Sequence, residues 1–254
     1  MAIVRDIPES FTECLTIADH PALIDVKKAK EQHSIYCRTL SELGLKIETI
    51  KADERLPDCC FTEDTAVVLD EIAIITRPGM PERMLETIEI ENSLRAFRKI
   101  SRIIAPAHLE GGDVVVIDKN IFIGESSRTN IDGIHQVQKI VYPYGYKVIS
   151  LPIKDTLHLK SVCTYLGNGH IILAPGHLDE SYFSAYTIIH VPESESYCAD
   201  TLNINGKILI PEGFPKTKKL IESKGFEVLT LDTSEIRKAD GALTCMSVVF
   251  DAHN

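Results

Sequence analysis

The chain has 254 residues, of which 44% are hydrophobic, and a formal net charge of −10. That length suffices to bury a full hydrophobic core. The longest cluster of lysine and arginine is the short KTKK run at 216–219. The sequence therefore lacks the broad basic surface that is used to bind nucleic acids. Because no stretch approaches the roughly 18 continuous apolar residues that a membrane span needs, we expect no membrane association.

Cysteine usage indicates a reducing compartment. The seven cysteines are scattered along the chain, and an odd number fits free thiols better than a disulfide framework. The first ten residues carry charges at Arg5, Asp6 and Glu9, unlike a secretion signal. The adjacent Cys59 and Cys60 cannot form the usual C-x2-C zinc loop. We therefore expect a cytoplasmic protein with no metal.

The elements predicted in chain order form a repeat. The apolar run 2–7 has the character of a strand, and an amphipathic helix is predicted over 26–44. Four β-hairpins follow, each with two apolar runs around a polar turn; they cover 65–79, 113–128, 162–176 and 200–213. Apolar residues at helical spacing follow the hairpins and predict amphipathic helices, most clearly at 129–145 and 216–225. The third hairpin is followed only by the shorter segment 179–186.

A fifth copy of this unit forms only if the two ends of the chain join, with the strand run 243–250 pairing with 2–7. Five units of roughly 50 residues are typical of radially arranged repeats. Pairing the termini would also remove the exposed edges of an open array. We therefore predict one α/β domain over residues 1–254, a five-bladed propeller, with a three-layer α/β sandwich as the alternative.

Ionisable side chains precede or interrupt the apolar runs of several units. Burying such groups without partners costs several kcal/mol, and matched positions of a ring face the same axis. Taken singly, each has an ordinary explanation, as a core thiol, a satisfied histidine or a turn-capping acid. In chain order these residues are Asp58, Glu63, Asp64, Glu110, Asp113, His158, Asp240 and Cys245.

The convergence of a thiol, an imidazole and several carboxylates predicts a cysteine hydrolase. Cysteine is weakly nucleophilic as a neutral thiol and needs a histidine to handle protons. Nearby carboxylates raise the pKa of a thiol and so disfavour the thiolate. A cationic guanidinium bound between Asp64 and Glu110 would neutralise those charges and promote ionisation of Cys245. We therefore expect a substrate that carries a guanidinium group.

Seven motifs, in order and at consistent spacing, carry a family resemblance. They are EQH at 31–33, DERLPDCCFTED at 53–64, IITRPG at 74–79, LEGGD at 109–113, FIGESSRTN at 122–130, LHLK at 157–160 and KADGALTCMS at 238–247. Together they resemble dimethylarginine dimethylaminohydrolase, one of the guanidino-modifying enzymes. The resemblance covers nearly the whole chain and implies the pentein propeller, in which pseudo-five-fold ββαβ repeats surround a central active site.

The resemblance also implies a role for each residue of the reacting centre. Cys245 matches the nucleophile, His158 the general acid and base, and Glu110 the carboxylate that holds both the guanidinium and the histidine. Glu63 and Asp64 match carboxylates that line the guanidinium pocket.

For the amino-acid end of the substrate, the resemblance implies a second group of residues. Arg83 and Arg128 match the pair that grips the substrate carboxylate. Asp58 and the backbone carbonyl of Leu15 match the site of the α-amine. Ala239 stands where a backbone carbonyl faces the substrate.

The implied reaction converts a methylated arginine to citrulline. The Cys245 thiolate attacks the guanidinium carbon, dimethylamine or methylamine leaves, and water hydrolyses the resulting S-alkylthiouronium. No metal and no organic cofactor takes part. Arginine deiminase or another guanidino hydrolase is the alternative, although deiminases carry a helical insertion for which this chain has no room. A non-catalytic binding protein with the same five-fold ring is a second alternative. A homodimer is left open.

Three positions depart from the family pattern. Cys60 replaces a common valine, a change that could alter packing or add a second reactive thiol near the site. The stretch 13–25, predicted to be a lid, agrees with the family only at Leu15 and Thr16. Ala239 is smaller than the usual branched residue, which a backbone role tolerates.

Overall fold

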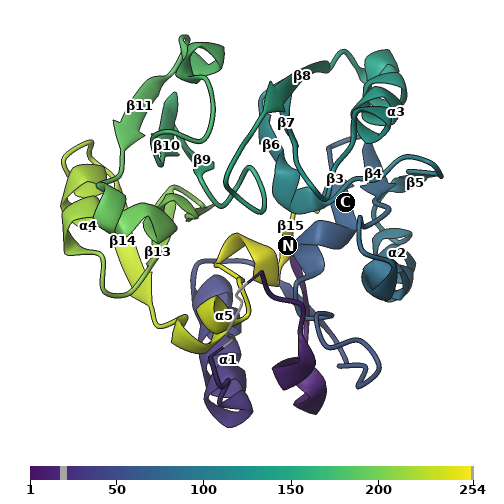
Figure 1. Ribbon diagram of the computed structural model, residues 1–254, viewed down its shortest axis with the longest axis horizontal. Coiled ribbons are helices and arrows are strands. Elements are labelled where there is room, and N and C mark those ends of the chain that lie inside the picture. Colours follow the sequence, from purple (N-terminus) through teal and green to yellow (C-terminus); the bar gives the residue numbers. More distant parts are fainter. Residues whose placement is uncertain (18–21, 253–254) are drawn as a thin grey trace.

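The computed structural model describes residues 1–17 and 22–252. Its strands form five sheets of three strands each, set as blades around a central axis (Figure 1). By blade, the strands are β15 (Val248–Val249), β1 (Ala2–Arg5) and β2 (Ile47–Ile50); β3 (Ala66–Val68), β4 (Ile72–Ile75) and β5 (Lys99–Arg102); β6 (Val114–Ile117), β7 (Asn120–Glu125) and β8 (Lys147–Pro152); β9 (Cys163–Gly167), β10 (His170–Leu173) and β11 (Thr187–His190); and β12 (Leu202–Ile204), β13 (Lys207–Pro211) and β14 (Glu227–Leu231).

All five blades share one topology. The first two strands of each sheet pair antiparallel and the second and third pair parallel, as expected for a hairpin followed by a crossover. The first blade joins the two ends of the chain, with Ala2 opposite Val249 and Ile3 opposite Val248. The five-bladed α/β propeller is therefore confirmed, and the three-layer sandwich is wrong because no sheet is continuous between blades.

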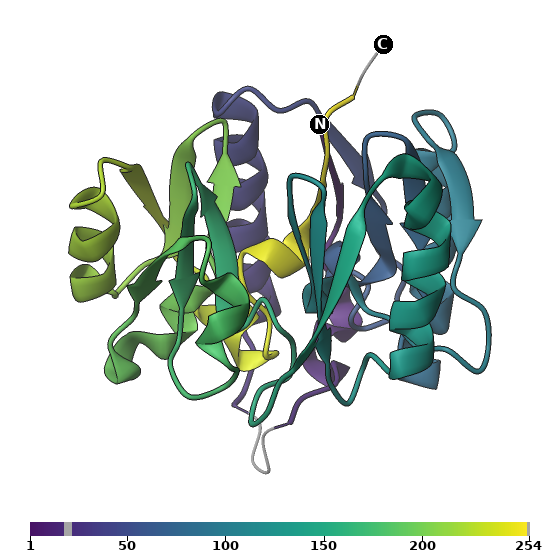
Figure 2. The ribbon, with the colours of Figure 1, turned by 90° about the horizontal axis from the view of Figure 1, so that it is seen from above.

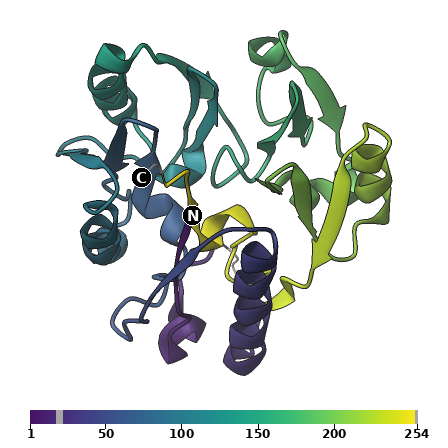
Figure 3. The same cartoon turned by 180° about the vertical axis from the view of Figure 1, so that it is seen from behind.

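Helices cover the outer rim of the ring (Figures 1 and 3). Seen from the edge, α1 and α3 run roughly along the axis (Figure 2). Both helices begin at a residue whose side chain caps the first turn. Asp25 accepts a hydrogen bond from the Lys28 amide, and Asn130 accepts one from the Gly133 amide. The segment 179–186 holds only the short 3-10 helix η6, Glu180–Phe183. The α-helices are α1 (Val26–Glu42), α2 (Thr87–Leu94), α3 (Ile131–Val141), α4 (Pro215–Glu222) and α5 (Ser234–Lys238).

The first strand of every blade lines a cavity on the axis. This axial cavity has a volume of about 470 Å³, and β3, β6, β9, β12 and β15 all contribute residues to its wall. The segment that leads into each first strand consequently lies near the axis too. Among the described residues, no helix is both long enough and apolar enough to cross a membrane.

The predicted strand run 243–250 is mostly not a strand. Residues Thr244–Met246 form a 3-10 turn, η8, and only Val248–Val249 pair in the sheet. The Tyr36 hydroxyl donates to the Leu243 carbonyl at 3.0 Å, and the Asp200 carboxylate accepts from the Thr244 amide at 3.1 Å. These side chains occupy backbone groups that a strand would have offered to its neighbour, so Cys245 lies on a turn.

Candidate active site

The side chains of the candidate site come from the segments just before the innermost strands. The 3-10 helix η2 (Thr62–Thr65) carries Glu63 and Asp64 ahead of β3, and η4 (Gly111–Asp113) follows Glu110 ahead of β6. His158 precedes β9 and Cys245 precedes β15. Successive blades thus deliver their polar residues to one place on the axis, as the repeat predicted.

Two glycines let these segments approach closely. A Cβ on Gly111 would lie 2.0 Å from the Glu63 carbonyl oxygen, and one on Gly112 would lie 2.8 Å from both the Asp64 carboxylate and the His158 ring. A side chain at position 111 would collide with the backbone, and one at position 112 would push the Asp64 and His158 side chains out of place. The two glycines of the LEGGD motif therefore allow Glu110, Asp64 and His158 to meet.

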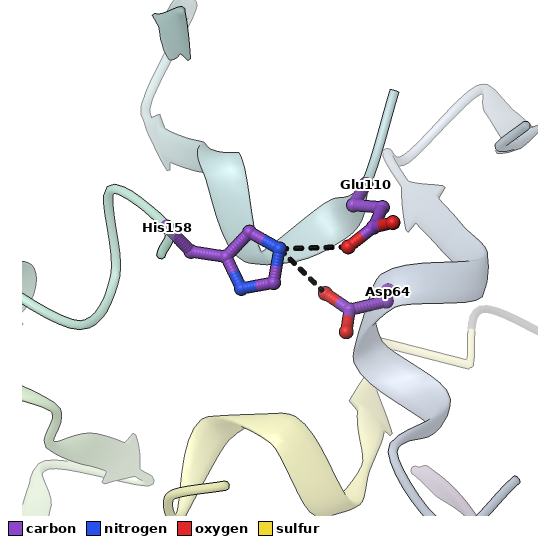
Figure 4. Close-up of side chains that lie close together, drawn as sticks. All are labelled: Asp64, Glu110 and His158. Atoms are coloured by element: carbon purple, nitrogen blue, oxygen red, sulfur yellow. Dashed lines mark hydrogen bonds and ion pairs between the residues drawn. The ribbon is translucent and has the colours of Figure 1, made fainter. Parts of the chain in front are cut away.

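His158 is held between carboxylates. Its Nε2 lies 2.8 Å from Glu110 Oε2 and 3.8 Å from Asp64 Oδ1 (Figure 4). Asp113 Oδ1 accepts a bond from the Leu159 amide at 3.0 Å, which fixes the backbone beside the histidine. All four side chains are buried. The imidazole consequently has one fixed orientation.

These carboxylates control the charge on the imidazole. Burial by itself lowers the pKa of His158, but Asp64, Asp113 and the bond to Glu110 outweigh it and raise the pKa to about 9. Burial raises the pKa of Asp64, whereas His158 and Arg83 lower it to about 2. At neutral pH the site therefore holds an imidazolium and an ionised Asp64, so His158 can donate a proton.

Arg83 and Arg128 both reach the site, with different partners. The Arg83 guanidinium donates to Glu86, to Asp64 at 2.7 Å and to the Phe61 carbonyl, and its side chain is 5% exposed. Arg128 Nη1 lies 3.4 Å from Glu110 Oε1. Arg83 is thus largely engaged by protein carboxylates, and Arg128 is less tightly held.

Asp64, Glu110 and His158 are the cluster of described residues whose spacing could suit a metal ion. Their ligand atoms already have partners: Asp64 accepts from the Gly112 amide and Arg83, and Glu110 from the Gly79 amide and His158. The Arg83 guanidinium beside two of the three groups supplies the positive charge that a cation would bring. This donor set fits an arginine-neutralised carboxylate cluster better than a metal centre.

A narrow cavity of about 30 Å³, called the substrate cavity here as a candidate, joins most of the predicted site residues. Asp58 Oδ2 accepts from the Leu15 amide at 3.2 Å, and Asp240 Oδ2 accepts from the Ile17 amide at 2.7 Å, so the start of the predicted lid forms one wall. Residues 18–21 of that lid lie outside the described residues. The cavity is lined by Leu15, Thr16, Ile17, Asp58, Phe61, Asp64, Arg83, Arg128, Leu157, His158, Ala239, Asp240, Gly241 and Cys245.

Two of the predicted residues lie outside the wall of that cavity. Glu110 is fully buried behind His158. Glu63 lines the axial cavity instead, where its carboxylate accepts from Lys160 at 2.7 Å and from the Thr244 hydroxyl at 2.7 Å. Glu63 therefore faces the axial cavity, although it is close enough to Cys245 to raise the pKa of that thiol.

Sequence reasoning missed one buried acid, Asp200. It stands two residues before β12, in the segment that supplies site residues in the other blades, and it is hydrogen-bonded to both the amide and the hydroxyl of Thr244, the neighbour of Cys245. The repeat itself could have revealed it, because Asp200 begins the fourth predicted hairpin as Asp113 begins the second.

Cys60 is not the second reactive thiol that its position suggested. It is fully buried in the core around Phe61 and Phe11. Burial raises its pKa well above the usual range, and Cys59 and Asp58 raise it further. A neutral, inaccessible thiol is a packing residue.

A family model described as "N,N dimethylarginine dimethylhydrolase, eukaryotic" matches residues 15–250. The chain is 37% identical over 250 residues to the N(G),N(G)-dimethylarginine dimethylaminohydrolase of Pseudomonas aeruginosa, with 98% of each chain covered. It belongs to the dimethylarginine dimethylaminohydrolase family. The namesake protein of Streptomyces coelicolor is 31% identical, covering 97% of this chain and 95% of its own.

Solved structures of dimethylarginine dimethylaminohydrolases share the fold. The P. aeruginosa enzyme, in a cysteine-to-serine mutant complexed with citrulline, superposes with a TM-score of 0.95 at 36% identity and 98% coverage of both chains. The N-terminal domain of ArgZ, a cyanobacterial arginine dihydrolase, superposes with a TM-score of 0.88 at 20% identity, with 97% of this chain and 96% of that chain covered. That second likeness concerns the fold alone.

The free protein should react slowly with iodoacetamide at neutral pH. Burial raises the pKa of Cys245 well above its usual range, and Asp200, Glu63 and Asp64 raise it further. The two other half-buried thiols are also unreactive, since burial raises the pKa of Cys14 to about 12 and that of Cys37 to about 11. Peptide mass spectrometry across a pH series should give a labelling pKa for Cys245 above 7. The unfolded protein is the control, and a pKa near 5 would contradict this expectation.

Proposed function

We propose that this protein hydrolyses Nω,Nω-dimethylarginine, and Nω-monomethylarginine, to citrulline and dimethylamine or methylamine. The observation that carries the proposal is that Cys245 and a charged, carboxylate-bound His158 face the same cavity, in a chain whose dimethylarginine dimethylaminohydrolase relatives align over its full length. The relative solved with citrulline binds the expected product.

In the proposed reaction the substrate activates its own nucleophile. Asp64 acts on Cys245, Glu110 is bonded to His158, and both carboxylates are buried. A guanidinium bound between the two carboxylates would add the positive charge that a thiolate requires. The thiol proton passes to solvent and the thiolate attacks the guanidinium carbon. His158 then gives its proton to the dimethylamine nitrogen as the carbon–nitrogen bond breaks.

The second half of the reaction uses the histidine in its other state. Having lost its proton, His158 accepts one from a water molecule, which attacks the S-alkylthiouronium carbon. The carbon–sulfur bond breaks, the new hydroxyl loses its proton as it becomes the carbonyl of citrulline, and the departing Cys245 thiolate takes up a proton to restore the thiol. His158 ends as an imidazolium, so the cycle returns to its starting protonation.

The amino-acid end of the substrate has complementary charges available. Arg128 is placed to bind the α-carboxylate, with Arg83 behind it, while Asp58 and the Leu15 carbonyl border the same cavity and suit the α-amine. The Ala239 carbonyl is proposed to face the guanidinium side. A cavity of about 30 Å³ holds about one water molecule, so the wall at Leu15–Ile17 has to move when substrate binds.

Turnover of a substrate panel tests the proposal. Asymmetric dimethylarginine, monomethylarginine and arginine should be compared at equal concentrations, following dimethylamine, methylamine, ammonia and citrulline. We expect kcat/KM to be highest for the methylated substrates. Ammonia released from arginine as the fastest product would instead make the protein a deiminase, and no citrulline from any of the three would favour a binding protein.

We further propose that residues 1–254 act as one domain in the cytoplasm. The pairing of β1 with β15, which joins the two ends of the chain, and the seven free cysteines support this. Whether the protein forms a homodimer can be measured by light scattering, independently of the catalytic assignment.

A further inference from the structure

Asp200 and Glu63 share one threonine hydroxyl beneath the nucleophile. Asp200 Oδ1 accepts from the Thr244 amide at 3.1 Å, and Asp200 Oδ2 lies 3.0 Å from Thr244 Oγ1. The same Oγ1 lies 2.7 Å from Glu63 Oε2. All three side chains are buried, and Cys245 is the next residue along the chain.

If both acids are ionised, only one proton, that of the Thr244 hydroxyl, is available for its two contacts with carboxylate oxygens. A hydroxyl carries a single proton, whereas an ionised carboxylate can only accept. Thr244 can therefore satisfy one of the two carboxylates, and the other contact would press two lone pairs together in a buried site, which is costly. A proton on one of the carboxyl groups makes both contacts hydrogen bonds.

The surroundings decide which acid carries that proton. Burial raises the pKa of Glu63, but Glu63 Oε1 accepts from the Lys160 ammonium at 2.7 Å, which opposes that rise and favours the ionised form. Asp200 is 2% exposed, and its hydrogen-bonding partners among the described residues are the neutral amide and hydroxyl of Thr244, with no cation among them. The proton therefore belongs on Asp200, which donates to Thr244, which in turn donates to Glu63.

We propose that Asp200 is a positioning residue for the nucleophile, which holds a proton in the free enzyme, orients the Thr244–Cys245 turn and withholds a negative charge from Cys245. The proposal rests on the proposed role of Cys245 as nucleophile and deepens it. It also explains how a thiol tolerates so many acids nearby, because one of them is kept neutral.

The charged groups around Asp200 agree with this assignment. Burial and the charge of Glu63 together raise the pKa of Asp200 to about 7, although the bonds from Thr244 and the charge of Lys160 oppose the rise. Below pH 7 the carboxyl is therefore neutral, and above it the ionised group raises the pKa of the Cys245 thiol. Asp200 lies in a group of titratable and charged side chains that interact electrostatically: Tyr36, Glu63, Lys160, Tyr197, Cys198, Asp200 and Cys245.

The test compares wild type with Asp200→Asn. Asparagine mimics the protonated acid, accepting from the Thr244 amide and donating to its hydroxyl, but it cannot ionise. Infrared difference spectra below pH 7 should show the carbonyl stretch of one protonated carboxylic acid in wild type that the variant lacks. The labelling pKa of Cys245 in the variant should fall by about one unit or more, because a nearby negative charge is gone.

Glu195→Gln provides the matched control. Glu195 is likewise a buried carboxylate that accepts from a threonine amide and hydroxyl, those of Thr217, but it is not among the groups that shift the pKa of Cys245. This variant should keep the labelling pKa of Cys245 at the wild-type value. A shift as large as that of Asp200→Asn would show that a general loss of packing moves the thiol, and would overturn the proposal.

Two further outcomes would also overturn it: an acid band that survives in Asp200→Asn, or a labelling pKa that does not change. If Asp200→Asn does not fold, the Thr244→Val variant is measured instead. Removing the hydroxyl that accepts the Asp200 proton should shift the frequency of the carbonyl stretch of the protonated acid. An unshifted band then overturns the proposal. The infrared result does not depend on turnover, so failure of the hydrolase assignment would appear separately, as wild type that makes no citrulline.

Discussion

Serine in place of Cys245 should lower kcat for dimethylarginine by about 10⁴-fold or more, the scale seen when a catalytic nucleophile is removed. A serine hydroxyl ionises far less readily than a thiol, and the nearby carboxylates of Glu63 and Asp64 oppose an anion at this position. Mass spectrometry of wild type quenched during turnover should show a covalent adduct on the peptide that holds Cys245, and the variant should show none.

Cys37→Ser is the control for this loss. Cys37 is also half-buried but lies on α1, beside His33 and away from the substrate cavity. Its replacement should leave kcat within about twofold of wild type, as expected for a change that touches no functional group. Undiminished turnover by the Cys245→Ser protein, with no adduct on wild type, would contradict the nucleophilic role.

Glutamine in place of His158 should lower kcat by about 10²- to 10⁴-fold, the usual contribution of a positioned acid or base. Glutamine can still donate to Glu110 Oε2, where the imidazole now does at 2.8 Å, so the local structure should survive. It cannot deliver a proton to the leaving amine.

The pH profile separates proton transfer from packing. The carboxylates raise the pKa of His158 to about 9, so wild-type kcat should fall on the alkaline side as the imidazolium loses its proton. A bound guanidinium lowers that pKa, which places the fall at or below pH 9. The fall should be absent from His158→Gln. A variant that keeps the same alkaline fall would show that another group supplies the proton.

The sequence alone was enough to predict the repeat, because alternation and turn residues are local signals. Hairpins at 65–79, 113–128, 162–176 and 200–213 became the first two strands of four blades, and the fifth blade followed from joining the ends. The residues before the hairpins were correctly expected to converge, since equal positions of a ring face one axis.

The tertiary structure decided what the local signals could not. The run 243–250 looks like a strand, but Tyr36 and Asp200, distant in sequence, take up its backbone groups and turn it. Glu63 faces Lys160 and the axial cavity, and Arg83 is bound by Glu86, because the partners of a buried charge depend on which segments the fold brings together.

The thiol at Cys245 shows both contributions. Its residue type, its position and its family motif were readable in the sequence, and they predicted a cysteine surrounded by acids. Which acids those are, and that one of them shares a threonine hydroxyl with another, follows only from distances across the axis between blades. Electrostatic effects on a pKa depend on such distances and on burial, and neither is written in the order of the residues.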